Sequence, residues 1–285
     1  MKRRRLLQDT TRMLGLVLAG LTAAPGRATD AKVTTAQPNV HVLQHPLDIP
    51  GLGRQRLLRI YLPPSYAGAP DRRYPVIYMH DGQNLFDAAT AYAGEWAVDE
   101  TLNAIAASTG FEAIVVGIDN GAEKRMNELS PVDHPRFGKG EGALYLAFIV
   151  HTVKPLVDQR WRTLPGRAST AIMGSSMGGL ISHAALNTYP GVFGRVGIFS
   201  PSYWVMPALF EQAAALALPA DTRVYLYAGG REGDTDALAK RMQAALSRQL
   251  PAHNLRLHVV PANEHNEAAW RAEFEPAVRW LFDIA

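Results

Sequence analysis

The chain has 285 residues, of which 47% are hydrophobic and 19% charged, a composition too apolar for an intrinsically disordered protein. It contains no cysteine, so disulfides, thiol nucleophiles and thiolate metal sites are excluded. The net charge of +3 comes from residues 1–28, where six basic residues and one acidic residue leave −2 for the remainder. This distribution argues against nucleic-acid binding, which requires a basic surface on the folded body.

The first 28 residues have the pattern of an export signal. A basic run over residues 2–5 precedes a short apolar stretch over residues 13–21, and small residues suited to cleavage follow. The pair Arg3-Arg4 also resembles a twin-arginine signal. The apolar stretch falls well short of the roughly 18 residues needed to span a membrane, so no stable span is expected in the mature chain. We therefore predict a periplasmic or secreted protein.

The sequence predicts a single folded domain after this signal. The predicted parts are an export signal over 1–28, a flexible segment over 29–40 and one domain over 41–285. Seven strands are predicted in the domain, at Leu57–Leu62, Val76–Met79, Ala113–Ile118, Thr170–Met173, Val196–Phe199, Val224–Tyr227 and Leu255–Val260. Several are apolar on both faces, as a buried parallel strand requires.

Helices are predicted between these strands, where apolar residues recur on one helical face. They lie around residues 146–157, 181–189, 238–246 and 270–281. Strands that alternate with helices of this length predict an α/β fold, with a mostly parallel central sheet and helices on both faces.

The stretch from Asp119 to Glu141 is long and has no periodicity. It leaves the carboxyl end of a predicted strand, the edge of the sheet at which ligands bind in such folds. We therefore expect it to form a wall or lid of the binding site. Its acidic and basic residues nearly balance, so it is not expected to trap anions.

The segment Gly174-Ser-Ser-Met-Gly178 joins an apolar strand to a helix, which is the setting of a nucleophile elbow. Side chains at Gly174 and Gly178 are expected to collide with neighbouring backbone, and Ser176 is forced into a strained conformation that holds its hydroxyl out from the sheet. The Met177 N–H, at the helix start, can donate to a developing oxyanion. Ser176 is therefore the predicted nucleophile, while Ser175 misses the spacing and is predicted to be structural.

A serine nucleophile needs a histidine base, and in α/β hydrolases the chain order is serine, acid, histidine. Among the histidines after Ser176, His265 lies in the loop between the last predicted strand and the last helix, at the expected edge of the sheet. His183, His253 and His258 fall within a helix, a surface loop and a strand, and are predicted to be structural. We predict that His265 is the base.

The acid is expected to follow the strand Val224–Tyr227, where Glu232, Asp234 and Asp236 are available. A carboxylate there holds the imidazole tautomer and stabilises the imidazolium. Asp234 or Thr235 can instead cap the following helix. This alternative role favours Glu232 as the acid, with Asp234 as the rival.

A second oxyanion donor is expected in the loop after the strand Val76–Met79, and the backbone N–H of Gln83 is the candidate. His80 and Asp81 in the same loop could be mistaken for a base and its acid. Because adjacent residues at a strand end point in opposite directions, both are predicted to be structural.

Several motifs together resemble the branch of the α/β hydrolases that contains esterase D, feruloyl and acetyl xylan esterases, and enterochelin esterases. They are Met79-His-Asp-Gly-Gln-Asn-Leu-Phe-Asp87, Gly174-Ser-Ser-Met-Gly-Gly179, Ser200-Pro-Ser-Tyr-Trp204 and His265-Asn-Glu267. The enterochelin-esterase-like members are the most similar. The resemblance implies an α/β-hydrolase fold and the same assignments for the nucleophile, base, acid and two oxyanion donors.

The resemblance also implies a substrate pocket flanked by Trp96 and Trp204, with core packing as the alternative for each. Arg125 is implied to bind a substrate oxygen unless it pairs with Glu128 or Asp119.

These inferences predict an exported serine esterase that forms an acyl-enzyme on Ser176. No cofactor or metal is expected, and the predicted partner is a small-molecule ester: a siderophore lactone, an acyl sugar or an aryl ester. An acyltransferase with the same triad and a non-catalytic binding protein are the alternatives. No oligomeric state is predicted.

Overall fold

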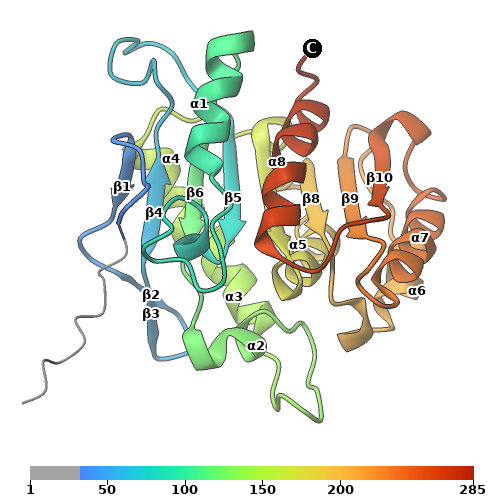
Figure 1. The fold of residues 1–285 in the computed structure, drawn as a ribbon. Helices are drawn as coiled ribbons and strands as arrows, with labels where there is room; N and C mark the ends of the chain where they lie inside the picture. The colour runs from blue at the N-terminus through green and yellow to red at the C-terminus, as the bar shows by residue number, and fades with distance from the viewer. Residues whose placement is uncertain (1–32) are drawn as a thin grey trace, which may run out of the picture. The chain divides into compact units, whose positions relative to one another are not determined.

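The computed structural model describes residues 33–285, so the predicted export signal lies outside the described residues. An eight-stranded sheet runs through the molecule in the order β1-β4-β6-β5-β7-β8-β9-β10 (Figure 1). Its strands are β1 (Val40–Val42), β4 (Leu58–Tyr61), β5 (Val76–His80), β6 (Ile114–Ile118), β7 (Thr170–Ser175), β8 (Arg195–Phe199), β9 (Arg223–Gly229) and β10 (Leu255–Val260).

The sheet is mostly parallel, as predicted. Every neighbouring pair from β6 to β10 is parallel, whereas β1 and β4 pair antiparallel with each other and β4 pairs antiparallel with β6. The parallel strands therefore end at one shared edge, the lower edge in Figure 1. Functional residues that follow these strands gather at that edge.

Helices cover both faces of the sheet, which confirms the predicted α/β-hydrolase architecture. The helices are α1 (Val98–Thr109), α2 (Arg125–Glu128), α3 (Gly142–Phe148), α4 (Lys154–Arg160), α5 (Met177–Thr188), α6 (Leu209–Ala215), α7 (Thr235–Leu246) and α8 (Glu267–Leu281). One face carries α1 and α8, and the other carries α3 to α7 (Figure 1).

The apolar core lies in two layers, one on each face. In β5, Val76 and Tyr78 pack towards the α5 face, while Ile77 and Met79 pack towards α1 and α8. This alternation follows from the two-residue period of a strand, and it explains why the central strands are apolar at every position.

Three short strands were not predicted. They are β1 at the edge of the sheet and the two-stranded ribbon of β2 (Leu47–Ile49) and β3 (Arg54–Arg56). Their three-residue length gives no readable period, and the Arg-Gln-Arg sequence of β3 lacks the apolar residues that mark a strand.

The predicted helix around residues 146–157 is interrupted. A π-helical segment over Ile149–Val153 joins α3 to α4. The apolar residues Ile149, Val150 and Val153 still face the core, so the predicted stripe is preserved across the irregular turn.

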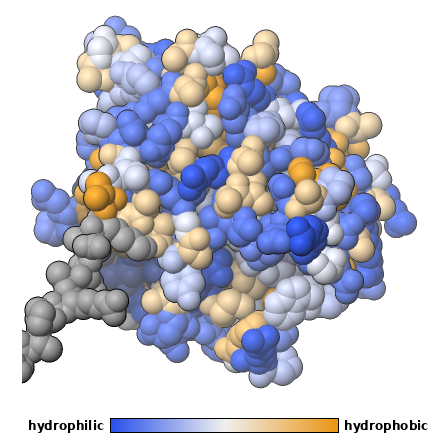
Figure 2. Space-filling view, viewed as in Figure 1, coloured by the Kyte–Doolittle hydropathy of each residue, from blue (hydrophilic) through white to orange (hydrophobic). Residues whose placement is uncertain are grey.

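Polar residues dominate the surface seen in Figure 2, and apolar residues are scattered over it. Within residues 33–285, no helix combines the length and the apolar character needed to cross a bilayer.

Candidate active site

Ser176 occupies a strained turn between β7 and α5. Its φ is +57° and its ψ −118°, a conformation that side-chain-bearing residues rarely adopt. The Ser176 N–H donates to the Phe199 carbonyl at 2.9 Å, and the Ser176 carbonyl accepts from the Ser202 N–H at 3.1 Å. These bonds to the end of β8 and the loop beyond it hold the turn, which has the strained geometry predicted from the sequence.

The glycines of the turn differ from the prediction in one respect. A Cβ at Gly174 would lie 2.9 Å from the backbone of Gly178, as expected. A Cβ at Gly178 would have side chains as its nearest neighbours, His80 at 3.3 Å and Asp81 at 3.6 Å, so the predicted collision of Gly178 with backbone is wrong. Gly179 is the tighter position, because a Cβ there would lie 2.8 Å from the Phe199 carbonyl oxygen.

His265 and Glu232 are brought together, 33 residues apart in the chain. His265 Nδ1 lies 2.9 Å from Glu232 Oε2, and the Glu232 side chain is fully buried. The other oxygen, Oε1, accepts from the Gly229 N–H and from Ser200 Oγ, each at 2.7 Å. A carboxylate held by this many donors has a fixed orientation and can fix the imidazole in turn.

The rival carboxylates do not reach His265. Asp236 pairs with Lys240 at 2.7 Å on the exposed side of α7. Asp234 occupies the N-cap position of α7, although its side chain makes no capping hydrogen bond. Glu232 is therefore the one of the three that contacts His265.

The remaining late histidines lie elsewhere, as expected. His183 is buried in α5 against Tyr203 OH at 2.8 Å, and burial lowers its pKa to about 3. His258 pairs with Glu273 at 2.7 Å, and His253 lies exposed in a short turn before β10.

A cavity of about 940 Å³ opens beside Ser176 and His265, and both residues line it. Within the described residues the two side chains do not hydrogen-bond to each other. The Ser176 hydroxyl instead faces Ser202 Oγ at 3.3 Å. Catalytic hydrogen bonds are often long without substrate and shorten when it binds, so a shared cavity is the relevant test of proximity.

Gln83 lies across this cavity in a 3-10 turn over Gly82–Asn84. The Asn120 N–H donates to Gln83 Oε1 at 3.1 Å, and Thr90 Oγ1 donates to the Gln83 carbonyl at 2.7 Å. These contacts fix the turn. Over residues 33–285, the backbone N–H groups of Gln83 and Met177 have no hydrogen-bond acceptor, so both are available to a ligand.

His80 and Asp81 line the cavity but do not form a base–acid pair. His80 Nδ1 lies 2.8 Å from Tyr145 OH, and burial lowers its pKa to about 4. Asp81 forms a bidentate ion pair with Arg125 at 2.6 and 2.7 Å and accepts from Asn120. Burial opposes ionisation, but Arg125 holds the pKa of Asp81 below its usual range. Both act structurally, as predicted.

The partner of Arg125 was predicted wrongly. Arg125 lines the cavity and pairs with Asp81, rather than with Glu128 or Asp119. Those two acids are already occupied by arginines from the preceding strands, Arg54 and Arg56 at Glu128 and Arg59 at Asp119. Such pairings across 60 or more residues have no local sequence signal.

The two tryptophans implied by the resemblance have different positions. Trp96 lines the cavity and also packs in the core, 3% exposed and against Trp270 and Phe199. Trp204 is 49% exposed, lies outside the cavity lining and packs against the loop residue Phe137. The expectation that Trp204 flanks this cavity therefore fails.

Three residues of the site were missed at the sequence level. Trp270 lines the cavity, contacts the His265 ring at 5.0 Å between centroids and donates through Nε1 to Ser200 Oγ at 2.9 Å. Its place in the apolar stripe of α8 indicated only a core residue. Tyr92, 91% exposed, forms part of the rim from a stretch without periodicity. Ser200 opens the Ser200-Pro-Ser-Tyr-Trp204 motif, but that motif did not indicate its contact with Glu232.

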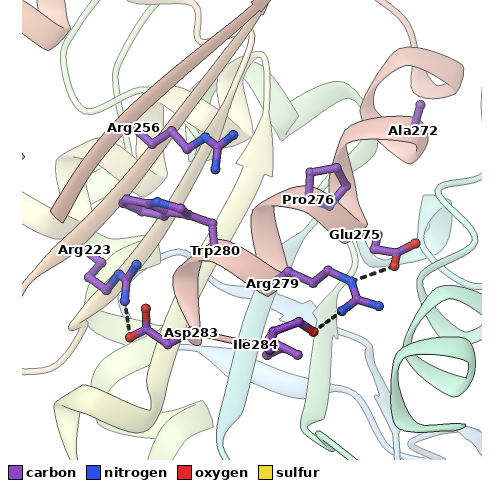
Figure 3. A pocket seen from close by; sticks show the side chains of 10 residues that line it. Arg223, Arg256, Ala272, Glu275, Pro276, Arg279, Trp280, Asp283 and Ile284 are labelled. Carbon is purple, nitrogen blue, oxygen red and sulfur yellow. Dashed lines mark hydrogen bonds and ion pairs between the residues drawn. The ribbon is translucent and has the colours of Figure 1, made fainter. Parts of the chain in front are cut away.

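A second cavity, about 680 Å³, lies near the amino ends of β9 and β10, away from the edge that carries Ser176 (Figure 3). Trp280 and three arginines line it. Arg223 pairs with Asp283, and Arg279 pairs with Glu275 at 2.8 Å (Figure 3). Its lining contains no serine or histidine, so it offers no nucleophile and base.

The parallel sheet, the strained serine turn and the position of His265 after the last strand define an α/β hydrolase. Residues 49–281 match the family model described as Putative esterase, and the chain belongs to this family. It is a carboxylic ester hydrolase.

Three similar proteins extend the comparison. The chain is 27% identical over 243 residues to the uncharacterized protein YbbA of Bacillus subtilis, covering 80% of this chain and 92% of that one. It is 32% identical over 133 residues to a siderophore triacetylfusarinine C esterase of Aspergillus fumigatus, 46% of this chain and 44% of the relative. The enterobactin esterase FES of Shigella flexneri, solved in the presence of enterobactin, has the same fold with a TM-score of 0.68. That structure is 20% identical, and the match covers 87% of this chain and 60% of FES.

Proposed function

We propose that the protein is a serine esterase that works through an acyl-enzyme on Ser176. The observation that carries this proposal is one cavity lined by a strained serine and by a histidine held on a buried glutamate. Ser176 Oγ attacks the ester carbonyl carbon, and His265 takes the hydroxyl proton and passes it to the departing alcohol. Water then attacks the acyl-enzyme with His265 again as base, which releases the acid and restores Ser176.

The free N–H groups of Gln83 and Met177 are proposed to form the oxyanion hole. Gln83 lines the cavity from its 3-10 turn, Met177 directly follows Ser176 at the start of α5, and neither N–H has a hydrogen-bond partner within the described residues. Preorganised donors of this kind stabilise the tetrahedral intermediate by roughly 3 kcal/mol each.

The proposed substrate is a bulky siderophore ester. The size of the cavity and its aromatic lining of Tyr92, Trp96 and Trp270 support a large acyl or alcohol group. The names of two relatives, which are siderophore esterases, support the same class. Arg125 is already paired with Asp81, and Glu267 adds a negative charge to the lining, so the site favours a substrate with little negative charge.

Labelling with a fluorophosphonate tests the nucleophile. We expect the probe to modify Ser176 in the folded protein, and Ser176→Ala to lose both labelling and ester hydrolysis. Ser175→Ala is the matched control, because the adjacent serine belongs to β7 and is expected to keep labelling. Labelling of Ser176→Ala, or none in the wild type, would refute the proposed mechanism.

A hydrolysis panel tests the substrate. It compares an iron-free siderophore ester with feruloyl and acetyl sugar esters at equal concentration. A higher kcat/KM for the siderophore ester supports the proposal, and a preference for either of the others rejects it without affecting the mechanism.

We also propose that residues 1–28 direct export, which rests on the sequence pattern alone. Fractionation of cells that produce the full chain should find the protein outside the cytoplasm. Replacing Arg3 and Arg4 with lysine should retain it inside if the twin-arginine route is used.

A further inference from the structure

One carboxylate of the active-site cavity has no partner. Glu267 is the first residue of α8, two residues after His265, and it lines the cavity that contains Ser176. Within residues 33–285, the Glu267 carboxylate forms no hydrogen bond and no ion pair. We propose that Glu267 binds a positively charged group of the substrate, so that the enzyme selects esters that carry an ammonium group. This inference rests on the proposed esterase function of the same cavity.

The cavity carries an excess of negative charge. Asp81 and Glu267 are its acidic lining residues, and Arg125 is the single lysine or arginine among the described residues that line it. Arg125 is held by its bidentate pair with Asp81, and no ion pair joins it to Glu267. The carboxylate of Glu232, behind His265, adds a further negative charge. Glu267 is therefore the carboxylate left for a ligand.

The histidines of the lining do not reverse this balance. Burial lowers the pKa of His80 to about 4, so this residue is neutral near pH 7. His265 must itself be neutral to act as a base. A cavity of net negative charge attracts cations and disfavours anions.

An aromatic side chain lies close to Glu267. A Cβ at Gly94 would lie 3.0 Å from the Glu267 Cβ, so the loop that carries Tyr92 passes directly beside the start of α8. The Tyr92 N–H donates to Asn84 Oδ1 at 3.1 Å, which fixes the backbone of this loop at the cavity. Tyr92 lines the cavity and is 91% exposed, so most of its ring surface is free to contact a ligand.

A single carboxylate among aromatic rings is suited to an ammonium group. Trp96 and Trp270 line the same cavity as Tyr92. A cation above an aromatic face is attracted by the electrons of the ring, and the carboxylate supplies the opposite charge. A metal ion fits less well, because hard cations require several oxygen ligands.

The position of Glu267 in α8 also gives it a structural role. An acidic residue in the first turn of a helix interacts favourably with the helix dipole. That interaction acts on the stability of the protein and is the same for every ligand. A binding role depends on the charge of the ligand, so two ligands that differ only in charge distinguish the two roles.

The test compares choline with its uncharged isostere 3,3-dimethylbutan-1-ol as competitive inhibitors of the hydrolysis of a 4-nitrophenyl ester. In the wild type we expect an inhibition constant about tenfold lower for choline, and a smaller difference at high ionic strength. Glu267→Gln should bring the two constants within about twofold of each other, because it removes the charge and keeps the shape. Glu267→Asp keeps the charge and should retain part of the preference.

Glu264→Gln is the matched control. Glu264 belongs to the same loop as His265, but it pairs with Arg231 and lies outside the cavity lining, so this variant should keep the preference for choline. Equal constants for the two compounds in the wild type, or a preference that persists in Glu267→Gln, would overturn the proposal. The wild-type comparison does not depend on whether a variant folds.

Calorimetric titration of Ser176→Ala with the same two compounds separates this inference from the proposed function. It gives the same comparison without turnover, so the preference can be measured even if the protein hydrolyses no ester. Tighter binding of choline by Ser176→Ala supports the subsite, and equal binding of the two compounds refutes it.

Discussion

The glutamate beside His265 is fixed by Ser200, which lies outside the cavity lining, and Ser200 is held in turn by Trp270, which lines the cavity. Ser200 sits at the end of β8 with a φ of +42°, which turns its hydroxyl towards Glu232 Oε1. The Trp270 indole donates to that hydroxyl, and the Trp270 ring also contacts His265. The acid and the base are therefore positioned by the same tryptophan, which explains how an exposed imidazole can keep a defined orientation.

At the residue scale, Glu232→Gln should lower kcat by about 10³–10⁴ with little change in KM, because an amide permits the wrong imidazole tautomer. Ser200→Ala should cost less, about tenfold, since the Gly229 N–H still holds the carboxylate. Steady-state kinetics on one ester measures both changes.

Asp234→Asn is the control for this pair and should leave kcat within twofold of the wild type. A large loss in Asp234→Asn together with an active Glu232→Gln would show that the neighbouring carboxylate is the acid.

At the scale of elements, the wall after β6 is anchored by an ion-pair network rather than by apolar packing alone. Glu128 of α2 is 1% exposed and accepts from Arg54 and Arg56, while Arg54 also forks onto Glu141 at 2.6 and 2.7 Å. The network joins the ribbon of β2 and β3 to the segment 119–141. Only the first part of that segment, through Arg125, reaches the cavity.

Glu128→Gln should destabilise the protein by about 3–5 kcal/mol, because it leaves the buried Arg56 guanidinium without its counter-charge and removes one of the two acidic partners of Arg54. Urea unfolding measures the change, and limited proteolysis should show earlier cleavage within residues 119–141. Glu141→Gln is the milder comparison, since the Glu141 side chain is 17% exposed and bonds one arginine. Equal stabilities for the two variants would contradict this ranking.

The elements with strong periodicity were predictable from the sequence, and those held by distant partners were not. The seven predicted strands and the stripes of α7 and α8 carry their own apolar pattern, and α5 could be placed because it follows the glycine-rich turn and ends before Pro190. The ribbon of β2 and β3 is fixed by arginines that meet glutamates more than 70 residues away, which no local window contains.

The residues of the candidate site also fall into two groups, those that could be predicted from the sequence and those that could not. Ser176, His265 and Glu232 could be proposed because chain order and loop position in an α/β sheet restrict them. Trp204 and the partner of Arg125 were misplaced because both depend on how loops fold back, which has no period in the sequence. The role of Trp270 in the site could not be predicted, because its place in the apolar stripe of α8 already accounts for a tryptophan. The same side chain packs in the core and contacts His265.

At the scale of the whole molecule, two buried neutral histidines make stability depend on pH. The pKa values of His80 and His183 are about 4 and about 3 in the folded protein, against about 6.5 in an unfolded chain. Below pH 6.5 the unfolded state therefore binds more protons than the folded state. The free energy of unfolding is not reduced by these histidines above that pH, and it falls as the pH decreases towards 4.

Each histidine should contribute a slope of up to about 1.4 kcal/mol per pH unit between pH 6 and pH 4. His183→Gln can keep a hydrogen bond to Tyr203 and removes one of these two histidines. The unfolding free energy of this variant should therefore fall less steeply with decreasing pH, by the slope of one histidine. The exposed His253→Gln should not. If the unfolding free energy of the wild type and of His183→Gln had the same slope against pH below pH 6, His183 would become protonated without unfolding the protein.

The sheet ends at β10, which has β9 as its single neighbour, and His265 comes five residues after that outermost strand. The serine, by contrast, leaves a strand flanked on both sides. Moderate heating should loosen the edge strand β10 and the loop that carries His265 before it loosens the central strands. Ester hydrolysis is therefore expected to decrease while tryptophan emission and ellipticity still report an intact fold. Heat inactivation would then be reversible on cooling, because the central strand β7 and the turn that carries Ser176 stay folded.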